Sequence, residues 1–136
     1  MPKPEGKSLL ILDDEVTYLE FLGNLMSEHL SCPVLTFSRP LSALEALPML
    51  DLGMIVTDYY MPQFNGIEFI RRARKISSST PFLIITGHGP KIESTDLSTI
   101  PELKRVIHKP FKWQALAEQV VVHWGGSMAP SIRIPN

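Results

Sequence analysis

The chain has 136 residues, of which 44% are hydrophobic and 20% charged, and its formal net charge is −1. This length corresponds to about one domain with a buried core, and the near-zero charge argues against nucleic acid or a membrane surface as direct partner. No apolar run approaches the roughly 20 residues of a membrane-spanning helix and no signal peptide opens the chain, so with a single cysteine the sequence predicts a cytoplasmic protein.

Short apolar segments alternate with segments of helical spacing along the chain. Continuous apolar character is typical of strands covered on both faces, as in a parallel sheet. The predicted strands are residues 8–12, 33–37, 54–57, 81–86 and 105–108. Helical apolar stripes follow over 16–30, 67–74 and 113–124, and a short or irregular helix is expected within 91–98. This alternation predicts an α/β fold with a parallel sheet.

Residues 7–124 are predicted to form one domain. Residues 125–136 begin with two glycines and contain two prolines. Because glycine and proline interrupt regular structure, we expect a flexible tail or the stub of a linker there, and not a second domain.

Polar residues stand where the predicted strands end. Asp13 and Asp14 follow the first strand, Asp58 ends the third, Thr86 ends the fourth and Lys109 follows the fifth. Ligands of open α/β sheets bind beyond these carboxyl ends, so these side chains converge if their strands are neighbours. Oxygen ligands without His or Cys suit a hard cation, Mg²⁺ before Zn²⁺. Carboxylate, metal, lysine and hydroxyl together are the parts for phosphoryl transfer to an aspartate.

Four segments carry a resemblance to a known family: LLILDDE, VTDYYMPQFNGIEFIRRAR, PFLIITGHG and VIHKPF. In this order and at strand ends, they resemble the response-regulator receiver domains of two-component signalling, among them chemotaxis regulators. The resemblance covers roughly residues 7–124. It implies a five-stranded, doubly wound, flavodoxin-like (β/α)5 fold and a phosphoprotein that carries an aspartyl phosphate. It also implies a signalling protein with only slow autophosphorylation and autodephosphorylation, and not a metabolic enzyme.

The resemblance implies a metal site around the phosphoacceptor. Asp58 would accept the phosphoryl group and also ligate Mg²⁺. Asp14 would bind the ion directly, with Asp13 assisting through water, and the backbone carbonyl of Tyr60 would be a further ligand.

The remaining matches would contact or admit the phosphoryl group. Lys109 would neutralise its charge, and Thr86 would hydrogen-bond it once formed. Gly87 would leave access for the phosphodonor, and Pro110 would follow Lys109 through a cis peptide bond, a bond almost confined to proline.

The implied partners act before and after this chemistry. The donor would be a histidine kinase or a histidine phosphotransfer protein. Phosphorylation would shift a two-state population at the face made by the fourth helix, fifth strand and fifth helix. That face would meet a downstream protein or an appended output domain, or form a homodimer.

Three features depart from the family pattern. Val106 occupies a position where relatives carry Tyr or Phe, so switching through an aromatic ring and Thr86 is not expected in its usual form. Tyr60 and His88 stand at positions that tune phosphoryl hydrolysis, and we expect their rings to shield Asp58 and lengthen the phosphorylated lifetime. The poor fourth helix predicts an altered output face.

Several alternatives stay open. Taken alone, Asp13 and Asp14 equally fit a helix start, where acids complement the helix dipole. The chain could be a phosphorelay intermediate or a receiver cut from a larger regulator or hybrid kinase. An aspartate-based phosphohydrolase usually needs a second acid where Tyr60 stands, which argues against that class. The intact set of polar residues argues against a pseudo-receiver that only binds partners.

Overall fold

A parallel five-stranded sheet forms the centre of the computed structural model, which describes residues 6–87 and 98–134. The strands are β1 (Ser8–Leu12), β2 (Val34–Phe37), β3 (Leu52–Asp58), β4 (Phe82–Thr86) and β5 (Leu103–His108). Their spatial order is β2-β1-β3-β4-β5, and every pairing is parallel. The order reverses beside β1, which confirms the doubly wound, flavodoxin-like sheet. Each predicted strand overlaps an observed one.

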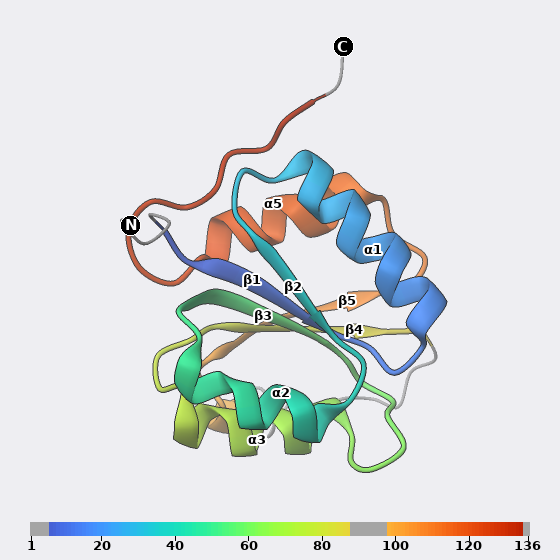
Figure 1. The fold of residues 1–136 in the computed structure, drawn as a ribbon, viewed down its shortest axis with the longest axis vertical. Helices are drawn as coiled ribbons and strands as arrows, with labels where there is room; N and C mark the ends of the chain where they lie inside the picture. Colours follow the sequence, from blue (N-terminus) through green and yellow to red (C-terminus); the bar gives the residue numbers. More distant parts are fainter. Residues whose placement is uncertain (1–5, 88–97, 135–136) are drawn as a thin grey trace.

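Helices cover both faces of this sheet (Figure 1). In the described part of the chain they are α1 (Val16–His29), α2 (Pro40–Ala46) with the 3-10 turn η1 (Leu47–Met49), α3 (Gly66–Ile76) and α5 (Trp113–His123). Figure 1 shows α1 and α5 on one face and α2 and α3 on the other. None of these helices has the length and apolar character needed to cross a membrane. The short helix expected within 91–98 falls mainly on residues outside the described ranges.

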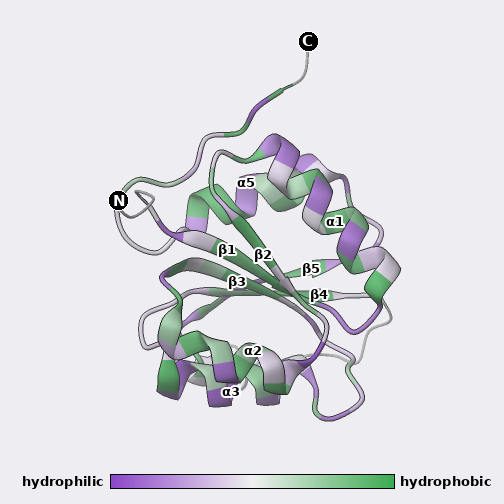
Figure 2. Ribbon diagram, viewed as in Figure 1, coloured by the Kyte–Doolittle hydropathy of each residue, from purple (hydrophilic) through white to green (hydrophobic). Residues whose placement is uncertain are grey.

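Two hydrophobic clusters form, one on each face of the sheet. Leu9 and Ile11 pack toward α1 and α5, whereas Leu10 and Leu12 pack toward α2 and α3. Successive side chains of a strand point to opposite faces of the sheet. When helices cover both faces, odd and even positions of the strand must therefore both be apolar. Figure 2 shows the resulting hydrophobic strands, with hydrophilic residues on the outer surfaces of the helices.

The predicted stripe of α1 is confirmed except at its first residue. Leu19, Leu22 and Met26 are buried, whereas Val16 is 52% exposed. The helix begins at the open carboxyl rim of the sheet, so its first turn lies beyond the strands that bury the later turns.

Residues 125–134 pack against the domain, which differs from the flexible tail expected for 125–136. Gly125 N–H donates to the carbonyl of Gly53 at 2.8 Å, and Ile132 forms an antiparallel bridge with Leu30. A Cβ on Gly125 would come within 2.7 Å of the Pro81 ring. Gly125, which was expected to make the chain flexible, therefore allows the backbone to approach Pro81 closely.

The same segment covers a buried histidine at the end of α1. His29 stacks on Trp113, with ring centroids 3.8 Å apart, and its Nδ1–H donates to the Arg133 carbonyl at 2.9 Å. The ring of His29 therefore joins α1 to α5 and to the C-terminal segment.

Candidate functional site

The predicted site residues lie at the carboxyl end of the sheet, on neighbouring strands. Leu12 is paired with Thr57, so the residues that follow, Asp13 and Asp58, lie side by side at the ends of their strands. The last pairs of β4 continue this rim, because Asp58 faces Ile85 and Thr86 faces His108. The expected convergence of strand ends is therefore present.

Three acids form the floor of the site. Asp13, Asp14 and Asp58 each offer a carboxylate oxygen, and these oxygens all lie within 4.8 Å of one another. Asp13 is buried, and its Oδ1 accepts a hydrogen bond from the Glu15 N–H at 2.9 Å. Asp14 is exposed and open to solvent. Three clustered oxygen donors without nitrogen or sulfur fit a hard divalent cation such as Mg²⁺.

Burial and mutual repulsion raise the proton affinity of two of these acids. Burial raises the pKa of Asp13 above its usual range. Burial, and then the negative charge of Asp13, raise the pKa of Asp58 to about 6, although Lys109 acts in the opposite direction. The cluster is therefore short of positive charge, which a divalent cation would supply.

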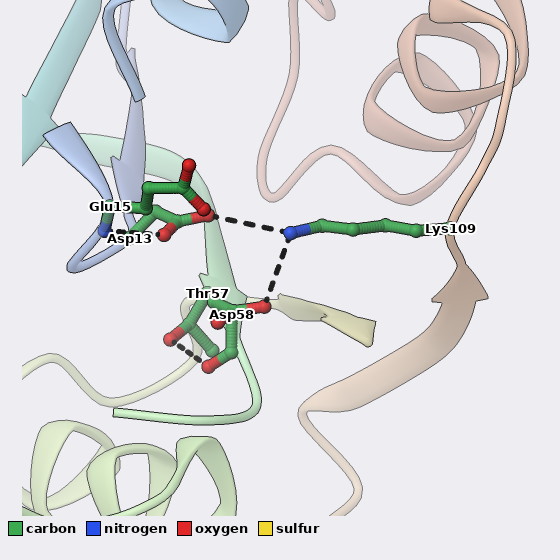
Figure 3. A network of polar contacts seen from close by, with 5 residues as sticks. All are labelled: Asp13, Glu15, Thr57, Asp58 and Lys109. Carbon is green, nitrogen blue, oxygen red and sulfur yellow. Dashed lines mark hydrogen bonds and ion pairs between the residues drawn. The ribbon is translucent and has the colours of Figure 1, made fainter. Parts of the chain in front are cut away.

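Lys109 reaches between the two acids from the end of β5 (Figure 3). Its Nζ lies 3.7 Å from Asp58 Oδ1 and 3.8 Å from Asp13 Oδ2. Direct charge-assisted hydrogen bonds are shorter, at roughly 2.7–2.9 Å. The ammonium thus lies between the two carboxylates and forms no direct hydrogen bond to either. The Lys109–Pro110 peptide bond is cis, as the resemblance implies.

Tyr18 is a site residue that the sequence reasoning missed. It lies in the first turn of α1, and Lys109 Nζ is 4.1 Å from the centroid of its ring. Burial, followed by the charges of Asp13 and Asp58, raises the pKa of Tyr18 to about 12, so the phenol is neutral at physiological pH. Its one sequence signal is helical spacing, four residues after Asp14, and only the packing shows which side chain it meets.

The β4 side of the site is lined by Thr86 and Gly87. Thr86 is buried, and its carbonyl accepts the Lys109 N–H at 2.8 Å. A Cβ on Gly87 would lie 3.6 Å from Lys109 Cδ, an ordinary contact distance. Val106 is paired with Ile84 and packs into the apolar cluster beneath α2 and α3.

Of the two predicted tuning residues, Tyr60 alone lies in the described part of the chain. Tyr60 is 50% exposed, and its ring lies edge-on to that of Tyr59 with centroids 5.1 Å apart. His88 lies outside the described residues. Shielding of Asp58 by these two rings therefore stays a prediction.

The loop after Asp58 is closed by the start of α3. Gly66 N–H donates to the Tyr59 carbonyl at 2.7 Å, and a Cβ on Gly66 would come within 2.8 Å of the Asp58 carbonyl oxygen. Asn65 caps α3 by accepting the Glu68 N–H at 2.9 Å. The Asn-Gly pair therefore holds the backbone of Asp58 against the helix, because no larger residue than glycine fits there.

Known proteins are similar in sequence to this chain. The family model of the response regulator receiver domain matches residues 9–121. The chain is 30% identical over 115 residues to the transcriptional regulatory protein FixJ of Bradyrhizobium diazoefficiens, covering 82% of this chain and 54% of FixJ. It is 31% identical over 124 residues to the chemotaxis protein CheY1 of Helicobacter pylori, covering 86% of this chain and 96% of CheY1.

A solved structure shares the fold. The crystal structure of a CheY-like response regulator receiver domain protein from Methanospirillum hungatei superposes with a TM-score of 0.75 at 20% identity, over 84% of this chain and 90% of that one. The chain spans about half the length of FixJ, so the comparison with that relative concerns its matching half alone.

Proposed function

The chain belongs to the response regulator receiver domain family of two-component signalling, and we propose that it is a phosphorylation-dependent switch with Asp58 as phosphoacceptor. One observation carries the proposal: Lys109 Nζ stands 3.7 Å from Asp58 and 3.8 Å from Asp13, so its single positive charge faces a cluster of three carboxylates. Such a site favours a ligand that brings both a cation and anionic oxygens to Asp58.

Asp13, Asp14 and Asp58 would hold a Mg²⁺ ion, with the backbone carbonyl of Tyr60 as a further ligand. The clustered oxygens support this assignment, since all lie within 4.8 Å of one another. When bound, Mg²⁺ supplies positive charge for the phosphoryl oxygens and lowers the proton affinity of the acids. In its absence, an Asp58 pKa of about 6 leaves part of the acceptor protonated in mildly acidic solution.

The phosphodonor would be a phosphohistidine of a histidine kinase or a histidine phosphotransfer protein. A carboxylate oxygen of Asp58 attacks phosphorus in line, the phosphorus–nitrogen bond breaks, and the imidazole nitrogen leaves with the bonding electron pair. Lys109 neutralises charge on the phosphoryl oxygens, and the Thr86 hydroxyl hydrogen-bonds one of them. Water later attacks the acyl phosphate, which releases inorganic phosphate and restores the carboxylate.

The output would be a change in protein–protein contacts at the face that contains β5 and α5. A downstream protein, an appended output domain or a second copy of the chain would read that face. Val106 packs in the core beside Ile84, so the change is not coupled through an aromatic side chain at that position. We propose a cytoplasmic signalling role with slow self-dephosphorylation, and no metabolic turnover.

The test is phosphorylation by a small-molecule donor, acetyl phosphate with Mg²⁺, followed by intact mass. We expect a Mg²⁺-dependent phosphoryl adduct on the wild type that Asp58→Ala abolishes. Asp51→Ala is the matched control, because Asp51 is exposed just before the amino end of the same strand. Beryllofluoride binding provides an independent measurement. A wild type with neither adduct nor response to beryllofluoride would leave Asp58 a structural acid.

A further inference from the structure

Within residues 6–87 and 98–134, two carboxylates and one aromatic ring lie close to the ammonium of Lys109: those of Asp13, Asp58 and Tyr18. The carboxylates of Asp58 and Asp13 lie 3.7 and 3.8 Å from Nζ, beyond direct hydrogen-bonding distance. The ring of Tyr18 lies 4.1 Å from Nζ at its centroid, well inside the roughly 6 Å range of cation–π attraction. The carboxylates are at ion-pair distance, and the ring is at a favourable distance for a cation–π contact.

Tyr18 is anchored, whereas Lys109 is a long side chain with many rotamers. The ring packs against the apolar cluster beneath α1 and α5, beside the buried residues Leu19 and Leu22. Lys109 keeps 27% of its side chain exposed. A flexible lysine loses rotamer freedom when it is held in one place, so a fixed neighbour that limits its positions reduces that loss at the moment of reaction.

A partly open pocket lies beside the stem of Lys109. It has a volume of about 230 Å³ and lies between α1 and the chain that follows β5. Its lining includes Tyr18, Phe21, Lys109 and Phe111. Lys109 thus forms part of the wall of a largely apolar pocket, while its ammonium lies toward the acids.

We propose that Tyr18 is a positioning residue for Lys109, whose ring face holds the ammonium above Asp58 where the phosphoryl group arrives. The inference rests on the proposed phosphorylation of Asp58. It adds to that proposal a residue outside the four sequence segments that carry the family resemblance. It commits to the ring face and not to the hydroxyl, because Nζ lies over the centroid. Phenylalanine should therefore replace tyrosine, and leucine should not.

The first measurement does not depend on phosphorylation. Protons beside an aromatic face are shielded by the ring current, so the Lys109 ε-methylene resonances of the wild type should lie upfield of those of an exposed lysine. Tyr18→Phe should keep this shift, and Tyr18→Leu should abolish it. Unshifted Lys109 resonances in the wild type would overturn the inference, whatever the fate of Asp58.

The second measurement is the rate of phosphorylation by acetyl phosphate at saturating Mg²⁺. A partly exposed cation–π contact corresponds to roughly a three- to tenfold change in rate, so we expect Tyr18→Leu to be slower by that factor and Tyr18→Phe to stay within about twofold. Asn24→Leu is the matched control, because Asn24 is exposed on the same helix, and its rate should equal that of the wild type. Urea unfolding of each variant verifies that it folds.

A double-mutant cycle separates positioning from a general structural effect. If Tyr18 acts through Lys109, adding Tyr18→Leu to Lys109→Ala should change neither the rate nor the beryllofluoride affinity further. A further loss in that background, or a Tyr18→Phe as slow as Tyr18→Leu, would overturn the inference. If the wild type takes up no phosphoryl group but shows the upfield lysine resonances, the proposed function fails and the ring contact stands.

Discussion

At the carboxyl end of β3 the chain places the half-buried acid Asp58, whereas near the amino end of the same strand Gly53 lies against the ring of Trp124. Around Asp58, charged groups stand 3.7–3.8 Å apart. Around Gly53 the chain is tightly packed: Gly125 N–H donates a hydrogen bond to the Gly53 carbonyl, and the indole of Trp124 is buried.

This difference shows that the two ends of one strand can have different roles: the carboxyl end of β3 carries the charged site, and its amino end carries tight packing. At the carboxyl end, burial and repulsion raise the pKa of Asp58 to about 6, so the ionised site is unfavourable until a cation binds. At the amino end, side chains fill the space so tightly that no Cβ fits on Gly53. Substitutions at the amino end should therefore lower the free energy of unfolding by disturbing packing. Substitutions of the acids at the carboxyl end should alter ligand affinity and the dependence of stability on pH.

The sharpest test exchanges glycine for alanine at each end. A Cβ on Gly53 would come within 2.1 Å of the Trp124 ring, whereas one on Gly87 would lie 3.6 Å from Lys109. Because tight packing cannot absorb the added methyl group, Gly53→Ala should lower the free energy of unfolding by about 3 kcal/mol or more. Gly87→Ala should change it by less than about 0.5 kcal/mol. Urea denaturation measures both, and equal effects would contradict the comparison.

A second prediction concerns the cost of the ionised acid. The pKa of Asp58 is about 6 in the folded chain against 3.8 for an ordinary Asp, so the stability that this group contributes is present below pH 3.8 and lost as the pH rises through about 6. Asp58→Asn should therefore raise the free energy of unfolding by about 2 kcal/mol at pH 7.5 without divalent cations. The gain should fade toward pH 4.

Urea denaturation with a chelator, repeated across this pH range, measures the gain. Asp51→Asn, at the exposed residue before β3, provides the control and should show no such pH-dependent gain. A destabilised Asp58→Asn variant, or a gain independent of pH, would show that burial of Asp58 is not costly.

The smallest effect is expected where residues 125–134 pack on the domain. Ile132 is half-buried and bridges Leu30, whereas Ile134 is 79% exposed. Ile132→Asp should lower the free energy of unfolding by about 1 kcal/mol, because a carboxylate would replace an apolar contact, while Ile134→Asp should be neutral. Phosphorylation by acetyl phosphate should be unchanged in both. Equal stability of the two variants would mean that the packing of residues 125–134 contributes nothing to the free energy of unfolding.

Much of the reactive end could be predicted from local patterns. Asp13, Asp58 and Thr86 each stand where an apolar run stops, and parallel strands bring their carboxyl ends to one edge. A strand that is buried on both faces needs apolar residues at odd and even positions alike, so it appears in the sequence as a continuous apolar run. Tyr18 could not be assigned in this way, since a tyrosine in a first helical turn has many possible neighbours.

Local patterns in the sequence predict the order of elements, the parallel sheet and the acids and lysine at its rim, because these features depend on residues close together in the chain. Tertiary structure alone decided that Lys109 rests on Tyr18, that His29 stacks on Trp113 and that residues 125–134 are docked. These contacts join residues far apart in sequence. They depend on how whole faces pack, and no local periodicity encodes that choice.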